Sequence, residues 1–249
     1  MLTEPTTEKL LAMKLNGMLA ALEDQRRDPR SGELSFEDRF AMLVDRQYLD
    51  VKQRACDARV KYAGLRLSGP CLEAVDYRLH RAVSRSQVEA LAGPDWIRHG
   101  RNVLITGATG LGKSFLAEAL ARQACRNGFR TLFYYSPKFF RELKTAELDG
   151  SLPRLLRRIR RAELLVLDDF GMEQAKTAEY RILLEILQDR TGIASTLVTS
   201  QYAVDAWHDL VRNPTVADAV LDRLVHGSYR LELEGDSVRK TMADRQLAP

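Results

Sequence analysis

The chain has 249 residues, of which 45% are hydrophobic and 29% are charged, and its formal net charge at pH 7 is +4. This composition is that of an ordinary globular protein and excludes an intrinsically disordered chain. No apolar run reaches the roughly 20 residues that a membrane-spanning helix needs. The three cysteines form no Cys-x-x-Cys pair, which excludes a disulfide framework and a zinc site of the usual spacing. Because the chain starts without a signal-peptide pattern, we expect a cytoplasmic protein that does not contact a membrane.

Arginine outnumbers lysine, 29 to 9. The guanidinium group presents a planar fork of hydrogen-bond donors that suits phosphate, so this bias favours a nucleotide or nucleic-acid partner. A G+C-rich genome encodes arginine by default and explains the same bias. Composition alone therefore leaves both interpretations open.

The first part of the chain, residues 1–66, is expected to form a small helical domain that contacts DNA or a protein partner. Apolar residues recur at helical spacing over Leu10–Leu22, and Ser35 is a good N-cap for a second, long amphipathic helix. That helix ends in a basic stretch, Lys52–Arg66. Residues 67–100 are predicted to be a linker with lead-in helices.

From residue 101 to 249, short apolar segments alternate with helical segments, which is typical of an α/β domain with a parallel sheet. The pair Ser136–Pro137 is typical of a helix start, with serine as the N-cap and proline at the first helical position. Five apolar segments are the expected strands: Asn102–Thr106, Thr131–Tyr135, Leu164–Asp168, Thr196–Ser200 and Tyr229–Leu233.

The most specific motif of the chain follows the first of these strands and fits the pattern G-x-x-x-x-G-K-[ST] in full. Glycines let backbone N–H groups close around a phosphate, and the next helix points the positive end of its dipole at the same anion. In such a loop Lys113 contacts the β- and γ-phosphates, and the Ser114 hydroxyl binds Mg²⁺. The sequence therefore predicts a site for ATP and Mg²⁺. Its expected residues are Gly107, Ala108, Thr109, Gly110, Leu111, Gly112, Lys113, Ser114 and Phe115.

Two carboxylates, Asp168 and Asp169, end another apolar strand. The carboxyl end of a buried parallel strand meets the sheet edge beside the phosphate loop, so we expect Asp168 to hold Mg²⁺ and Asp169 to polarise the attacking water. A further strand ends in Ser200 and Gln201. If it lies between the other two strands, Ser200 or Gln201 contacts the γ-phosphate or the water, and a solvent-facing strand end is the alternative.

Together these residues resemble the IstB-like family, AAA+ ATPases that assist the transposition of bacterial insertion sequences and are related to the DnaC helicase loader. The resemblance extends from Lys9 to Arg239 and depends on the order of several motifs rather than on the phosphate loop alone. These motifs are Asn102–Ser114, Leu164–Gly171, Thr199–Gln201, Trp207–His208, Leu221–Leu224 and Gly235–Arg239.

The resemblance implies an AAA+ domain with a central five-stranded parallel sheet, preceded by a helical N-terminal domain. It also implies that Arg223 is the arginine finger that reaches the nucleotide of a neighbouring subunit, and that Arg239 senses the γ-phosphate. An ordinary surface position is the alternative for either arginine. The pair Asp168–Asp169 departs from the Asp-Glu of most AAA+ proteins, which predicts slow hydrolysis. Too few residues follow Leu233 for the helical lid domain that most of them carry.

Two basic stretches are candidate DNA contacts. The second is residues 153–161. The resemblance places it in an extra helix that AAA+ proteins of the replication-initiator and helicase-loader group carry, and that helix lines the central path for DNA in their oligomers. Contact with phosphates predicts binding that is largely independent of sequence and weakened by salt. A solvated helix face paired with acidic residues is the alternative. The candidate residues are Lys52, Arg54, Arg59 and Lys61 in the first stretch, and Arg154, Arg157, Arg158 and Arg161 in the second.

The leading hypothesis is an ATPase that forms an ATP-dependent homo-oligomer on duplex DNA and assists a cognate transposase. Hydrolysis of ATP to ADP and phosphate then requires Mg²⁺ and is stimulated by oligomerisation. One alternative is a DnaC-like helicase loader, which holds single strands. Another is a small-molecule kinase built on the same phosphate loop, which binds ATP without forming oligomers.

Overall fold

The computed structural model describes residues 4–77, 84–173, 175–235 and 237. The chain divides into two compact units, residues 1–58 and 59–249. The division falls inside a long helix, upstream of the boundary predicted at residue 66, and the predicted partition into three segments stays a prediction. None of the described helices combines the length and apolar character needed to cross a bilayer.

The first unit consists of helices only. Ser35 caps the longest of them, because its hydroxyl accepts the N–H of Asp38 (3.1 Å) and donates to the Asp38 carboxylate (2.8 Å). Large apolar side chains of that helix are exposed, among them Phe36 (73%) and Phe40 (49%). Within its described residues this unit buries no large apolar side chain. The helices are α1 (Glu4–Ala12), α2 (Asn16–Arg27) and α3 (Phe36–Tyr62), which continues into the second unit, with a 3-10 turn at Pro29–Glu33.

The second unit is built on a parallel sheet with the strand order β2-β3-β4-β1-β5. The five predicted strands are confirmed, two of them with bounds that differ by one residue. The strand that ends in Ser200 does lie between the strand before the phosphate loop and the acidic strand. The strands are β1 (Val103–Gly107), β2 (Thr131–Tyr135), β3 (Leu164–Asp168), β4 (Ser195–Ser200) and β5 (Tyr229–Leu233).

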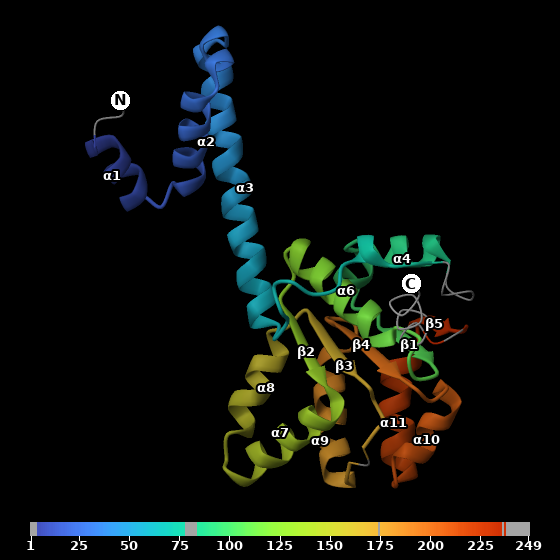
Figure 1. Ribbon diagram of the computed structural model, residues 1–249. Coiled ribbons are helices and arrows are strands. Elements are labelled where there is room, and N and C mark those ends of the chain that lie inside the picture. Colours follow the sequence, from blue (N-terminus) through green and yellow to red (C-terminus); the bar gives the residue numbers. More distant parts are fainter. Residues whose placement is uncertain (1–3, 78–83, 174, 236, 238–249) are drawn as a thin grey trace, which may run out of the picture. The chain divides into compact units, whose positions relative to one another are not determined.

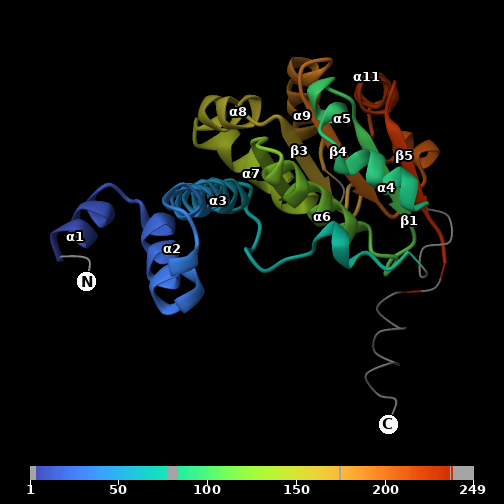
Figure 2. The ribbon, with the colours of Figure 1, turned by 90° about the horizontal axis from the view of Figure 1, so that it is seen from above.

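Helices cover both faces of this sheet, as Figures 1 and 2 show for α6 on one face and for α9 and α11 on the other. Alternate strand residues such as Leu104 and Leu165 join the core on the side of α9 and α11. Both faces are covered, and β1 and β3 are accordingly apolar along most of their length, whereas β4 is buried throughout but carries Ser and Thr at four of its six positions. The helices are α4 (Arg85–Ala92), α5 (Asp95–Arg98), α6 (Lys113–Arg126), α7 (Ser136–Leu148), α8 (Leu152–Arg160), α9 (Thr177–Arg190), α10 (Trp207–Leu210) and α11 (Pro214–Val225), with 3-10 turns at Leu72–Ala74 and Val204–Ala206.

The predicted N-cap at Ser136 is wrong. Strand β2 runs directly into α7, so the N-cap position falls on Tyr135, which makes no side-chain capping bond. The Ser136 hydroxyl is buried and has no hydrogen-bond partner among the described residues. Pro137 is therefore the second residue of the helix rather than the first, still within the first turn where proline is tolerated.

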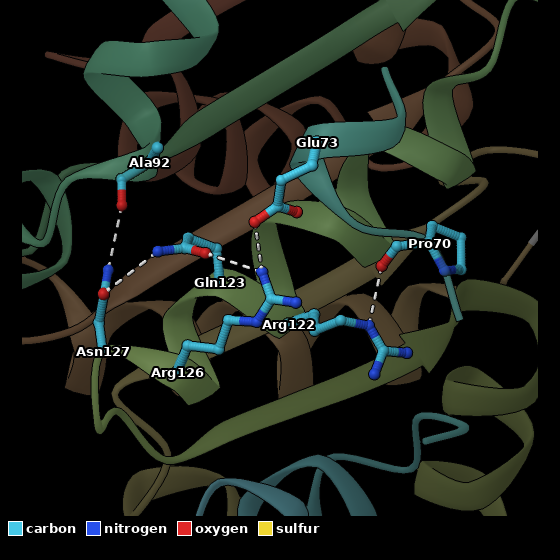
Figure 3. Close-up of polar contacts among 7 residues, drawn as sticks. All are labelled: Pro70, Glu73, Ala92, Arg122, Gln123, Arg126 and Asn127. Atoms are coloured by element: carbon cyan, nitrogen blue, oxygen red, sulfur yellow. Dashed lines mark hydrogen bonds and ion pairs between the residues drawn. The ribbon is translucent and has the colours of Figure 1, made fainter. Parts of the chain in front are cut away.

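Hydrogen bonds and an ion pair connect the segment that follows α3 to side chains of α6 (Figure 3). Arg122 donates to the backbone carbonyls of Leu67 (2.9 Å) and Pro70 (2.8 Å). Arg126, one turn further along α6, forms an ion pair with Glu73 (2.8 Å). The helix that begins at the phosphate loop is therefore held along its far end by the predicted linker. Among the described residues, which reach Ser237, no helical lid follows β5.

Candidate nucleotide-binding site

The phosphate loop connects β1 to α6, and its glycines are required by its backbone shape. Gly107, Gly110 and Gly112 have φ angles of +142°, +89° and +87°. Residues with a Cβ rarely adopt this conformation. A Cβ on Gly107 would lie 2.4 Å from the carbonyl oxygen of Leu233 on the neighbouring strand. The loop thus has the tightly wound form that turns N–H groups toward an anion.

Lys113 is the first residue of α6 and is 5% exposed. Its ammonium group donates to the carbonyl of Ala108 (2.9 Å), so the positive charge lies within the loop. Leu111 is buried, whereas Thr109 and Phe115 are exposed at the loop surface. The structure therefore brings the predicted lysine to the position where a phosphate group would meet it.

Asp168, at the carboxyl end of β3, is 7% exposed. Thr199 Oγ1 donates to its Oδ1 (2.7 Å), and the Ser114 side chain hydrogen-bonds to the same carboxyl group. Burial raises the pKa of Asp168 above its usual value, and the nearby charge of Asp169 acts in the same direction. The hydrogen bonds from Thr199 and Ser114 and the charge of Lys113 partly offset this rise. The side chains of Ser114 and Asp168, the two residues predicted to hold Mg²⁺, thus interact with each other.

The donor set at this position fits Mg²⁺. No group of three or more His, Cys, Asp or Glu side chains among the described residues could hold a metal ion. Mg²⁺ does not need such a group, because it keeps several waters and takes one or two protein oxygens together with substrate phosphates. The hydroxyl of Ser114 and the carboxylate of Asp168 are oxygens of this kind. They match a cation that binds together with a nucleotide.

Asp169 follows with a φ of +57°, in the left-handed region that a non-glycine residue seldom adopts. Its N–H donates to the same Thr199 hydroxyl (2.9 Å). The side chain is half-buried. The chain thus turns sharply at the predicted base, directly after the residue expected to hold Mg²⁺. The sequence placed Thr199 in the motif Thr199–Gln201 but assigned it no role, although a hydroxyl at the end of an adjacent strand was an available sign.

The end of β4 places its two polar residues differently. Gln201 Oε1 accepts a hydrogen bond from Thr109 in the phosphate loop (3.2 Å). Ser200 is fully buried, and its hydroxyl donates to the carbonyl of Phe170 (2.8 Å). The structure brings Gln201, rather than Ser200, to the phosphate loop.

Arg223 lies at the opposite edge of the sheet. Its guanidinium group donates to the carbonyl of Ala219 (2.8 Å), and its own carbonyl accepts from the side chain of Asn102 (2.7 Å). Asn102 directly precedes β1, whereas the phosphate loop directly follows it, and five strand residues span roughly 16 Å. Arg223 is therefore distant from the nucleotide site of its own chain. It lines an open pocket of about 390 Å³ together with Arg101 and His226.

Arg239, the other predicted nucleotide-contacting arginine, lies outside the described residues. The described Ser237 lies against the phosphate loop, because a Cβ on Gly110 would be 2.5 Å from the Ser237 hydroxyl oxygen. Of the residues around the predicted sensor, the described Ser237 therefore lies beside the loop.

Helix α8 presents its arginines on the surface. Arg158 is 3.9 Å from a carboxylate oxygen of Glu142, at the limit of an ion pair. Arg160, which was not among the predicted DNA contacts, is also exposed but binds Asp189 (2.6 Å) and Glu185 (3.6 Å). The others form no ion pair with any residue that the structure describes. These are Arg154, Arg157 and Arg161.

The first basic stretch is divided between the two compact units, with Lys52 and Arg54 in one and Arg59 and Lys61 in the other. Lys52 lies 4.4 Å from the centre of the Tyr48 ring. Arg54 binds Asp50, and Arg59 donates to the carbonyl of Cys125 (2.8 Å). Three of these four cations thus have partners within their own unit. Lys61 is exposed.

Comparison with known proteins gives one consistent family. The family model described as IstB-like ATP binding protein matches residues 8–246. The putative insertion-sequence ATP-binding protein y4pL of Sinorhizobium fredii is 41% identical over 240 residues, which cover 96% of this chain and 98% of that protein. The putative ATP-binding protein of insertion sequence IS1162 from Pseudomonas fluorescens is 38% identical, over 81% of this chain and 87% of that protein.

Solved structures share the fold at lower identity. The DnaC helicase loader aligns with a TM-score of 0.53 and 21% identity, covering 60% of this chain and 87% of that chain. The replication initiator DnaA bound to AMPPCP and single-stranded DNA aligns with a TM-score of 0.53 and 17% identity, over 70% of this chain and 56% of that chain. At these identities the likeness extends to the AAA+ fold alone.

Proposed function

The chain belongs to the IstB-like family of ATP-binding proteins, and from that premise we propose that it is an Mg²⁺-dependent ATPase that assembles on duplex DNA and assists a transposase in insertion-sequence transposition. The observation that carries the proposal is the phosphate loop, in which Lys113 lies within the loop and Ser114 hydrogen-bonds to Asp168. Relatives at 38% to 41% identity are insertion-sequence ATP-binding proteins. These relatives support the association with transposition.

Each residue around the loop has a task in this proposal. The loop N–H groups and Lys113 bind the phosphates of ATP, and Ser114 and Asp168 hold the cation. Mg²⁺, when bound, supplies the charge that neutralises the β- and γ-phosphate oxygens. Asp169 accepts a proton from the attacking water, which Gln201 orients from the end of β4. The carboxylate of Asp169 is one methylene shorter than a glutamate, so slow hydrolysis is expected.

Arg223 acts in this proposal on the nucleotide of a neighbouring copy of the chain. Its position at the amino edge of the sheet keeps it from its own phosphate loop, and an arginine supplied by a second molecule stabilises the charge that develops on the transferred phosphate. Hydrolysis is then fast only in the assembled state. ATP binding promotes assembly of the oligomer, and ATP hydrolysis leads to its disassembly.

DNA contact is assigned in the proposal to α8. Arg154, Arg157 and Arg161 are exposed and form no ion pair with described residues, so they are free to meet phosphates. The first basic stretch is a weaker candidate, because Arg54 and Arg59 already have partners. For residues 1–66, exposed apolar side chains such as Phe36 favour contact with a protein partner.

The test is sedimentation velocity with fluorescently labelled DNA, with and without ATP and Mg²⁺. The proposal predicts a large ATP-dependent species on duplex DNA that exceeds any species on single strands of equal length. Lys113→Ala removes the charge that binds the phosphates, so this variant is expected to lose nucleotide binding and the ATP-dependent species together.

Other outcomes would overturn the proposal in distinct ways. Assembly on single strands alone would favour a helicase loader. A monomer that binds ATP and ignores DNA would favour a small-molecule kinase.

A further inference from the structure

One buried hydroxyl contacts both carboxylate residues at the end of β3. Thr199 is fully buried, and its Oγ1 donates a hydrogen bond to Asp168 Oδ1 (2.7 Å). The same oxygen accepts the backbone N–H of Asp169 (2.9 Å). A hydroxyl group has one hydrogen to donate and two lone pairs to accept with, so it can make both bonds at once.

The two hydrogen bonds of the Thr199 hydroxyl lie just beyond the point where the regular backbone pairing of β3 with β4 ends. The parallel register of β3 and β4 runs up to the pair Leu167 and Val198. Beyond it, the carbonyl of Thr199 accepts the N–H of Phe170 (2.7 Å), and the Ser200 hydroxyl donates to the Phe170 carbonyl. The end of β4 thus holds three successive residues, the last of β3 and the two that follow it, through contacts that are not part of the sheet ladder.

The conformation held in this way is unfavourable on its own. Asp169 has a φ of +57°, which costs an aspartate free energy that the surrounding contacts must offset. The two consecutive carboxylates differ in burial. Asp168 remains beside Ser114, while Asp169 is half-buried at the surface.

We infer that Thr199 is a positioning residue that fixes Asp168 for cation binding and Asp169 for water activation through one shared hydroxyl. The inference rests on the proposed ATPase function. The bond to Oδ1 sets the rotation of the Asp168 carboxylate, and the bond from the Asp169 N–H holds the left-handed turn. Thr199 is fully buried and its hydroxyl bonds to these two aspartates, so its effect passes through them.

The test compares Thr199→Val with the wild-type chain by titrating a fluorescent ATP analogue at increasing Mg²⁺ concentrations and in EDTA. Valine keeps the size and branching of threonine and removes both hydrogen bonds. We expect the Mg²⁺ concentration for half-maximal tightening of nucleotide binding to rise about 10-fold, because partners of metal ligands typically contribute 10- to 100-fold to metal affinity or activity. Affinity in EDTA should change less than about 2-fold, since the loop and Lys113 are untouched.

Steady-state turnover gives a second readout on the assembled protein. We expect kcat to fall roughly 100-fold in Thr199→Val while KM at saturating Mg²⁺ changes little, which is the pattern of a group that acts in the transition state. Thr199→Ser retains the hydroxyl and should restore both readouts to within about 3-fold of wild type. A loss of packing alone would instead appear in the serine variant, which lacks the methyl group.

Thr131→Val is the matched control. Thr131 is fully buried at the start of β2, and its hydroxyl has no hydrogen-bond partner in the part of the chain that the structure describes. The same substitution there should leave Mg²⁺ dependence and kcat unchanged. A thermal melt of each variant checks the fold, and Thr199→Cys, which has only a weak donor, carries the test if the valine variant does not fold.

The outcomes separate the inference from the proposed function. If the wild-type chain binds nucleotide without any response to Mg²⁺, the proposed ATPase function fails. If the wild-type chain responds and Thr199→Val responds at the same Mg²⁺ concentration with the same kcat, the role of Thr199 is overturned and the ATPase function stands.

Discussion

The two edges of the parallel sheet both bury a charged side chain, and they use it differently. At the carboxyl edge, Asp168 is 7% exposed, and burial raises the pKa of its carboxyl group. At the amino edge, Arg190 is 2% exposed, and burial lowers the pKa of its guanidinium group to about 10. Arg190 donates to the carbonyls of Ala162 (2.7 Å) and Ile159 (3.1 Å) and to the Thr196 hydroxyl (3.3 Å).

The difference lies in what remains for a ligand. The donors of Arg190 are directed at protein oxygens of α8, β4 and the segments around them, so this charge ties the fold together. Asp168 is held by hydroxyl groups, and a carboxylate has about four acceptor sites, so it retains capacity to bind a cation. Burial alone therefore does not identify a functional charge. A functional charge is identified instead by acceptor sites that remain available for a ligand beside a phosphate-binding loop.

Arg223 is the strongest exception to this contrast between a structural amino edge and a functional carboxyl edge. It lies at the amino edge and yet is proposed to act on the nucleotide of a neighbouring copy. Arg223→Ala should retain ATP affinity and lose roughly 1000-fold in turnover, the size of effect that arginine fingers have. Arg101→Ala is the control, since Arg101 lines the same pocket. Steady-state ATPase assays on DNA-bound protein measure both.

Mixing the inactive variants sharpens this test. Arg223→Ala has an intact loop, and Lys113→Ala has an intact finger, so a mixture should recover part of the activity if the finger acts between copies. Normal turnover in Arg223→Ala alone would rule out the assignment.

The substitution Arg190→Met tests whether the buried charge at the amino edge of the sheet stabilises the fold. The substitution leaves several buried carbonyls without donors, so the free energy of unfolding should fall by about 3 kcal/mol. Nucleotide affinity of the folded fraction should not change. Urea denaturation measures the first and a nucleotide titration the second. Arg181→Met, an exposed position on the same helix, should cost less than about 0.5 kcal/mol.

Helix α8 carries both kinds of charge on its surface, one bound by protein groups and one available to a ligand. Arg157 forms no ion pair with a described residue, whereas Arg160 is bound by Asp189 and Glu185. Arg157→Ala should weaken duplex binding about 5-fold at moderate salt and reduce the salt slope by about 1. Arg160→Ala removes the same charge and should have a smaller effect. Equal affinities of wild type and Arg157→Ala in a fluorescence titration would contradict the placement of DNA on α8.

The smallest effect is expected for Asp168→Asn without nucleotide. The pKa of Asp168 is raised above 3.8 in the folded state, so the folded chain holds a proton that the unfolded chain releases, and stability falls as pH rises from 3.8 through the raised value. Asparagine removes this penalty, and the variant should be more stable at pH 7 by about 1 kcal/mol, or 2–4 °C in Tm. The additional stabilisation that Mg²⁺ gives in the presence of nucleotide should disappear. A lower Tm than wild type would contradict the role of burial.

Much of the fold and of the nucleotide site follows from local patterns. The five strands, the capped start of α3 and the phosphate loop are each encoded by residues within a few positions of one another. Asp168 could be placed beside Ser114 because parallel strands meet at one edge. The N-cap of α7 could not be located, because only the direct passage from β2 into the helix decides it.

By itself, the sequence determined that this protein has a parallel sheet, a phosphate loop and a carboxylate pair facing it, because periodicity and motif spacing are properties of neighbouring residues. Only the tertiary structure decided that Gln201 rather than Ser200 reaches the loop, that Thr199 joins the two aspartates, and that Arg160 is bound while Arg157 is not. Those distinctions depend on which way a side chain points and on which distant strand or helix it meets. Such pairings arise only when segments far apart in the chain pack together.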